Sequence, residues 1–237
     1  MNKIKSILFM LTLSMGCLVA CKKDKTPDPV PEPEFVEVSA HVKKYKNGTV
    51  VVNRLPMPDL KDISTRGYFN FDKMAFVDAG KLKTKEWDIV FEGLYAGTVF
   101  PNNGNTEEDF PWFGNAAKVI FSGIVKPFDE VTALPDNFVF PTGKTNLSTA
   151  ESNTEIARTN PIYWGYTTLD VDGGFSHFGV WKGKTFLWKL DDGRVVKFEL
   201  INVYNNAPEE NNIKSVPGYL SFRYFIGKAG SKDLKTN

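Results

Sequence analysis

TFLWKLDDGRVVKFELI, residues 185–201, is the clearest β-hairpin in the chain. Two apolar stretches, 185–190 and 195–201, flank Asp191-Asp192-Gly193-Arg194, and a turn that contains Asp-Gly between two such stretches is typical of a tight hairpin. The segment rich in Phe, Trp and Val suits a strand whose side chains are buried. The hairpin therefore predicts antiparallel β-structure in the C-terminal half.

Similar segments extend along the chain in both directions. Lys46-Asn47-Gly48-Thr49 predicts a second hairpin turn. Only residues 145–158 suggest a short helix, with Thr149-Ala150-Glu151 as its start. Elsewhere we find no long stretch of helical periodicity and no internal repeat, so the sequence predicts an all-β, antiparallel single domain with little helix. The further predicted strands lie at 35–38, 50–52, 67–71, 74–77, 87–92, 118–121 and 218–225.

The first 20 residues have the pattern of a bacterial lipoprotein signal peptide. Lys3 and Lys5 precede an apolar run, and Leu18-Val19-Ala20 leads directly to Cys21. We expect cleavage before Cys21 and attachment of lipid to its thiol, because two or more acyl chains anchor a protein stably to a membrane. A single-pass transmembrane helix is the alternative. However, the 14 residues from Ile7 to Ala20 are fewer than the roughly 20 that span a bilayer.

Residues 21–34, CKKDKTPDPVPEPE, contain four prolines and little to bury. This composition predicts a flexible, extended spacer. The expected organisation is a signal peptide at 1–20, a lipidated Pro-rich spacer at 21–34 and one β domain at 35–237.

The composition excludes several functional classes. With 29 basic and 28 acidic residues there is no electrostatic reason to expect nucleic acid as a partner. Cys17 and Cys21 both lie in or next to the signal, so the mature domain has no disulfide and no thiol nucleophile. No G-x-S-x-G, H-E-x-x-H or phosphate-binding glycine loop is present. We therefore predict that the protein is not an enzyme.

Several segments occur in a distinctive order along the chain: 67–71, 87–91, 117–123, 175–177, 186–189, 192–198 and 218–224. Together they resemble the HmuY family, the haem-binding lipoproteins of Bacteroidetes. The resemblance covers about residues 69–224 and is strongest at the C-terminal hairpin and the closing strand. It implies an all-β fold, a lipid anchor on the cell surface at the outer membrane, and haem capture for iron acquisition. It also implies transfer to an outer-membrane TonB-dependent transporter and two axial ligands, His or Met, presented from loops.

The chain departs from the family pattern because it lacks a residue for one of the two axial ligands. The segment expected to carry the first ligand, residues 134–163, contains no His and no Met. His177, in Phe175-Ser176-His177, resembles the second family ligand and is the leading candidate for binding iron. Haem would then have one protein ligand plus water or a distant residue, or this chain binds another molecule. The other possible ligands of the mature chain, His41, Met57 and Met74, lie before the region of strongest resemblance.

Aromatic and basic residues surround His177 in the sequence. Flat rings suit a flat macrocycle, and cations suit its propionates. The alternative interpretation is that these rings are ordinary core and rim residues and that His177 is a loop histidine. The expected haem-pocket residues are Tyr163, Trp164, Tyr166, Phe175, Phe178 and Trp181, and the expected propionate contacts are Arg158, Lys182 and Lys184. No metal other than haem iron is expected.

Two loops allow weaker hypotheses. Asp170-Val171-Asp172-Gly173-Gly174 resembles the start of a calcium loop but lacks the closing Glu, which favours a polar turn. Residues 102–109 form an acidic segment before Phe110-Pro111-Trp112-Phe113 that could contact a partner or could be a solvated loop.

The alternative function is a glycan- or protein-binding surface lipoprotein that has lost haem ligation, with Trp112 and the aromatics from Trp164 to Trp181 as a platform. Haem requires His177 beside a narrow slot. A glycan requires an open aromatic shelf with carboxamides or carboxylates nearby.

Overall fold

A computed structural model describes most of the chain from Glu34 onwards, and residues from Pro33 form one compact unit. The signal segment, Cys21 and most of the spacer lie outside the described residues. No helix in the described part of the chain is both long and apolar enough to span a membrane. The described ranges are 34–62, 65–104, 108, 110–142, 145–169, 175–206 and 215–236.

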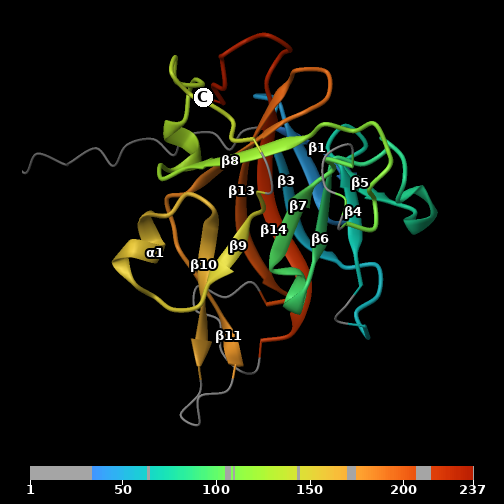
Figure 1. The fold of residues 1–237 in the computed structure, drawn as a ribbon, viewed down its shortest axis with the longest axis vertical. Coiled ribbons are helices and arrows are strands. Elements are labelled where there is room, and N and C mark those ends of the chain that lie inside the picture. The colour runs from blue at the N-terminus through green and yellow to red at the C-terminus, as the bar shows by residue number, and fades with distance from the viewer. Residues whose placement is uncertain are drawn as a thin grey trace, which may run out of the picture. The chain divides into compact units, whose positions relative to one another are not determined.

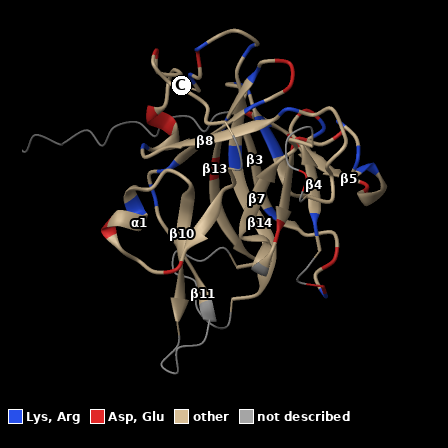
Figure 2. Ribbon diagram, viewed as in Figure 1, with Lys and Arg blue, Asp and Glu red and all other residues tan. Residues whose placement is uncertain are grey.

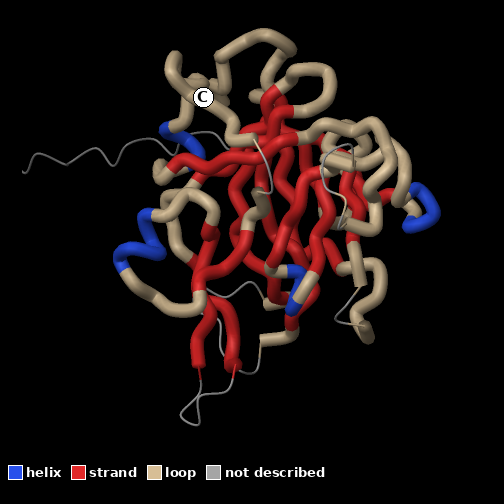
Figure 3. Tube along the Cα trace, viewed as in Figure 1, coloured by secondary structure: helices blue, strands red, loops and turns tan. Residues whose placement is uncertain are grey.

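A seven-stranded sheet forms the larger layer (Figures 1 and 3). Its strand order is β1-β2-β3-β14-β13-β12-β8, and every neighbouring pair is antiparallel. The strands are β1 (Phe35–Ser39), β2 (Val42–Tyr45), β3 (Val50–Pro56), β8 (Ile120–Ile124), β12 (Thr185–Lys189), β13 (Val195–Tyr204) and β14 (Pro217–Ile226).

The hairpin predicted at 185–201 is confirmed as β12 and β13. Trp188 pairs with Val196, and Gly193 adopts the left-handed φ of 82° that the tight turn requires. These strands are apolar on both sides because both faces of the sheet are covered. On one face Trp188 and Phe198 enter the main core, and on the other Leu187 and Val195 pack with Val131 and Leu234.

Two smaller sheets complete the fold. The four-stranded sheet has the order β5-β4-β6-β7 and the three-stranded sheet the order β11-β10-β9. A bridge between Val99 and Leu147 links β7 to the residue before β9. The strands are β4 (Gly67–Asn70), β5 (Ala75–Val77), β6 (Ile89–Glu92), β7 (Thr98–Pro101), β9 (Ser148–Ala150), β10 (Tyr163–Leu169) and β11 (Phe175–Val180). The all-β prediction is confirmed, although β9 and β10 pair in parallel.

The main core is a cluster of aromatic rings between the layers. Phe222 contacts Phe69, Phe91 and Phe198 at ring-centroid distances of 5.2–5.4 Å. Such offset and edge-on contacts add to the free energy that burial alone supplies. Trp188, the hairpin residue, contacts both Phe121 and Phe198 in the same core. The aromatic content of the sequence is therefore largely explained by packing.

Two sequence predictions were wrong in detail. The helix expected over 145–158 is the five-residue α1 (Glu155–Thr159), which begins after Thr154, whose hydroxyl caps the backbone N–H of Ala157. The expected start at 149–151 instead belongs to β9, because its backbone pairs with β10. Trp112 is fully buried against Phe110 and Trp87, so it cannot serve as an exposed platform.

Candidate functional site

His177 lies within strand β11, so the expectation that it is presented from a loop was wrong. Thr168 stands directly opposite it on β10, and the Thr168 hydroxyl bonds to the backbone of His177 at 2.7 and 3.1 Å. The imidazole is half-buried, and this burial lowers the pKa of His177. At neutral pH the ring is consequently neutral, which is the form that binds iron.

Tyr166 and Trp181 lie on the same side of the sheet as His177. Gly179 faces Tyr166 across the strand pair, and a Cβ added to Gly179 would lie 2.2 Å from the Tyr166 ring. Because alternate residues of a strand share a face, the ring of Tyr166 covers the face that carries His177. Trp181 packs beside Tyr166 at a centroid distance of 5.3 Å. The structure thus places three of the predicted residues on one face of the strand pair, with Trp181 buried beside Tyr166.

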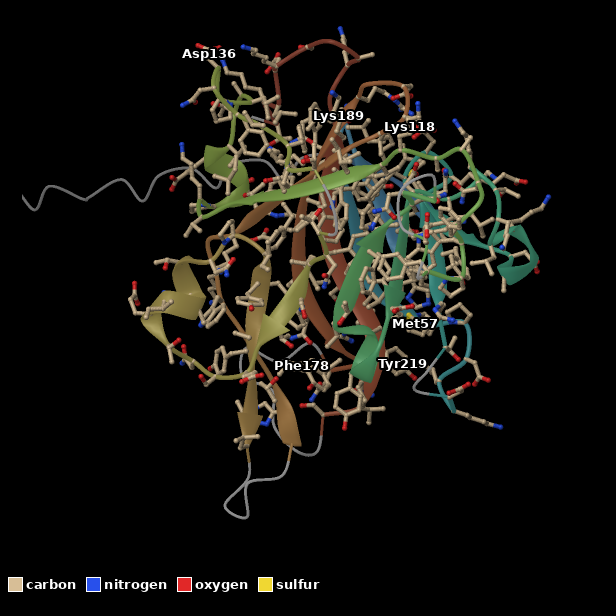
Figure 4. The ribbon with its side chains drawn as sticks, in the orientation of Figure 1. Met57, Lys118, Asp136, Phe178, Lys189 and Tyr219 are labelled. Atoms are coloured by element: carbon tan, nitrogen blue, oxygen red, sulfur yellow. The ribbon has the colours of Figure 1, made fainter. Side chains whose placement is uncertain are left out.

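Trp164 and Phe178 instead belong to the main core. Trp164 donates from its indole nitrogen to the carbonyl oxygen of Gly97 at 2.7 Å. Phe178 is labelled in Figure 4. Its ring meets Trp164 and Tyr95, at 5.7 and 5.9 Å between centroids. Both side chains are almost fully buried, as the core interpretation of these aromatics expected. The side chain of Phe175 is outside the described part of the structure.

The three predicted cations have different environments. Lys184 is buried, and its ammonium donates to the carbonyl oxygens of Asn160 and Tyr163 at 2.8 and 2.7 Å. Burial, with a smaller contribution from Arg158, lowers the pKa of Lys184 to about 8. Lys184 is therefore committed to the backbone. Arg158 on α1 and Lys182 are exposed and can meet a ligand carboxylate. Figure 2 shows charges of both signs distributed over loops and strand ends.

A polar hollow lies between β9, α1 and the start of β10. Its volume is about 490 Å³, and Tyr163 lies in its wall together with residues from β9 and α1. Tyr163 was expected in a haem pocket. The hollow itself was not expected, because its other walls come from segment 145–158, for which the sequence predicted a helix. The lining residues are Asn146, Ser148, Thr149, Ala150, Glu151, Ser152, Ala157, Ile162 and Tyr163.

A second hollow, of about 360 Å³, contains the mostly buried carboxylate of Asp88. Burial raises the pKa of Asp88 to about 6, although the backbone N–H of Phe71 donates to this carboxylate at 2.8 Å. Nearby, Asp72 accepts two bonds from Arg194, at 2.7 and 2.6 Å. These contacts hold the 191–194 turn of the main hairpin against the loop after β4.

The remaining candidate iron ligands lie apart from this face. Met57 is buried in the main core beside a small hollow that Tyr95 and Gly218 also line. His41 follows β1, and its Nδ1 lies 3.1 Å from the carbonyl oxygen of Asn53. Met74 occupies a turn with a left-handed φ of 55°. Among the described residues, no group of three or more His, Cys, Asp or Glu is placed to hold a metal ion, and the 170–174 loop lies outside them.

The structural neighbours found by comparison with known proteins include two proteins from Bacteroides. One is a proposed HmuY-like heme-binding protein from Bacteroides vulgatus, with 16% identity, a TM-score of 0.38, and coverage of 81% of this chain and 96% of its own. The other is a proposed lipoprotein from Bacteroides fragilis, with 14% identity, a TM-score of 0.34, and coverage of 81% and 92%. No protein-family model and no curated protein matches the chain.

Proposed function

We propose that this chain is a lipid-anchored surface protein that binds haem, or a related porphyrin, without catalysing a reaction. The observation that carries the proposal is the face shared by His177, Tyr166 and Trp181. Burial keeps the imidazole neutral, so it can donate an electron pair to ferric iron at neutral pH. The partly exposed ring of Tyr166 offers an aromatic surface for a macrocycle, and the buried ring of Trp181 packs against it at 5.3 Å.

The exposed cations complete this arrangement. Arg158 and Lys182 are the groups that we assign to the propionates, since Lys184 donates to two backbone carbonyls. The second axial position would be taken by water or by a ligand from elsewhere in the chain.

The anchor and the partners of this proposal follow from the sequence. Cys21 would carry the lipid at the outer membrane, residues 21–34 would act as the spacer, and residues 35–237 would present the haem on the cell surface. A TonB-dependent transporter would receive the haem for iron acquisition.

The test is a haemin titration of the full chain, followed in the Soret region in both oxidation states. The protein is held in a polyoxyethylene detergent, and an identical micelle solution without protein is the blank. The variants are His177→Ala and, as its matched control, His41→Ala, because these are the only two histidines. We expect a saturable Soret shift that is lost in His177→Ala and retained in His41→Ala.

The other outcomes are equally informative. Saturable binding that survives His177→Ala would move the iron site to another residue. The absence of any saturable shift in the wild-type protein would overturn the haem proposal.

A further inference from the structure

The polar hollow beside α1 is lined by both hydrogen-bonding and apolar residues. Its volume of about 490 Å³ is within the range of small-molecule sites, which is roughly 300–1,000 Å³. Besides Tyr163, five of its nine lining residues have hydrogen-bonding side chains: Asn146, Ser148, Thr149, Glu151 and Ser152. Such groups can both donate to and accept from ligand hydroxyls.

The same hollow has an apolar side. Ala150, Ala157 and Ile162 contribute small aliphatic surfaces, and Tyr163 contributes an aromatic ring. A ligand that fits must therefore combine several hydroxyls with a C–H face that can rest on carbon. A pyranose ring has this combination.

The charge of the lining residues argues against an anionic ligand. Glu151 is the only charged residue among the nine, and no cation is present among them. Phosphates and other anions would thus meet a carboxylate with no compensating charge. The haem propionates also lack a cationic partner there, since the lining contains no Lys or Arg.

Several contacts hold the walls of the hollow in place. Ser148 pairs in parallel with Tyr163, and its N–H donates to the carbonyl oxygen of Ile162 at 3.0 Å. The buried ammonium of Lys184 bonds to the carbonyl oxygen of Tyr163. The indole of Trp181 donates to Asn153 at 3.0 Å, next to the rim residues Glu151 and Ser152. A site held in this way loses less conformational entropy when a ligand binds.

We infer that this hollow is a binding site for a neutral pyranose, either a single sugar or one residue of an oligosaccharide. The site does not depend on haem, because the residues that line it do not include His177. Glu151 at the rim sets the preference for uncharged sugars over uronic acids.

The first experiment screens the full chain, in polyoxyethylene detergent, on an array of neutral, N-acetylated and uronic-acid oligosaccharides. A detergent without a sugar head group is essential because a maltoside would compete. Hits are then titrated by calorimetry. We expect saturable binding of a neutral sugar with a dissociation constant between about 1 μM and 1 mM, which is typical of a small polar ligand.

Three substitutions in the lining and one control substitution outside it locate the site. Asn146→Ala and Tyr163→Ala should each weaken binding at least fivefold, while Asn53→Ala, an exposed carboxamide on β3, should leave it unchanged. Since Tyr163→Ala also alters packing, Glu151→Gln serves as the surface variant that keeps the fold. It should bring the affinity for glucuronic acid closer to that for glucose.

Two results would overturn the inference: no saturable binding of any neutral sugar, or neutral-sugar binding that Asn146→Ala leaves unchanged. His177→Ala should bind the sugar as the wild-type protein does. Loss of haem binding in that variant with retained sugar binding would separate the two sites.

Discussion

The main hairpin region and the three-stranded sheet are both antiparallel in large part, yet they are built differently. In the first region the β12–β13 pair is regular, and although β13 and β14 shift register near Asn202, all three strands carry closely packed rings in the main core. In β9, β10 and β11 the strands include a parallel pair and irregular register, and most side chains are only partly buried. His177 and the polar hollow both lie in the second region. Close packing stabilises the first region, whereas incomplete packing leaves the second with surfaces for a ligand.

The largest expected effect is in the hairpin region. Phe198→Ala removes a fully buried ring that contacts Phe222, Trp188 and Phe71. We expect the free energy of unfolding to fall by about 4 kcal/mol, measured by denaturant titration. Ile201→Ala, at an exposed position of the same strand, should cost far less. Equal losses of stability at the two positions would mean that close packing of the Phe198 ring does not stabilise the hairpin region.

The second prediction concerns Asp88, which lies in the hollow beside the 191–194 turn of the main hairpin. Its folded-state pKa of about 6 lies above the ordinary value of 3.8, so the folded protein retains a proton that the unfolded chain has released. The contribution of Asp88 to the free energy of unfolding is therefore complete below about pH 4. It falls by roughly 2–3 kcal/mol as the pH rises through about 6. Asp88→Asn, which retains an acceptor for Phe71, should abolish this loss and raise stability at pH 7.5.

Asp72 is the control, because its pKa is shifted in the opposite direction to that of Asp88. Its hydrogen bond with Arg194 lowers the pKa of Asp72, so the stability it supplies is present above its ordinary pKa and is lost as the pH falls through the lowered value. Asp72→Asn should therefore remove a stabilising contribution at pH 7.5. The same sign of change at pH 7.5 in both variants would contradict the assignment.

Gly165 tests the three-stranded sheet. A Cβ at this position would lie 2.2 Å from the carbonyl oxygen of Gly179, so β10 and β11 must separate in Gly165→Ala. We expect a loss of about 2 kcal/mol in the free energy of unfolding, together with weakened haem binding. Gly193→Ala is the matched control in the main hairpin: nothing lies within 4 Å of the added Cβ, and only its left-handed φ is strained. If Gly193→Ala weakens haem binding as much as Gly165→Ala does, the close approach of β10 and β11 is not what shapes the site.

The smallest expected effect is at the start of α1. Thr154→Ala removes the hydroxyl that caps the N–H of Ala157 and should cost about 1 kcal/mol. Thr154→Ser, which keeps the hydroxyl, should restore the stability. Hydrogen exchange at the amide of Ala157 measures the local change, and unchanged exchange in Thr154→Ala would show that the cap contributes nothing to the wall of the hollow.

The sequence alone predicted the hairpin at 185–201, the turn at 46–49 and most strands of the large sheet. These predictions succeeded because alternating apolar residues and Asp-Gly or Asn-Gly turns act over a few neighbouring residues. The same local patterns failed at 145–158, where β9 forms by pairing in parallel with β10 beyond α1, and they did not identify β10 and β11 as a strand pair.

Side-chain environment was decided only by the tertiary structure. The sequence identified the aromatic and basic residues near His177 but could not tell Trp164, which lies in the core, from Tyr166, which covers the His177 face. It could not show that Lys184 is buried against two carbonyls or that Trp112 is enclosed. The physical reason is that strand alternation fixes which residues share a face, while the packing of one sheet on another decides which face is buried.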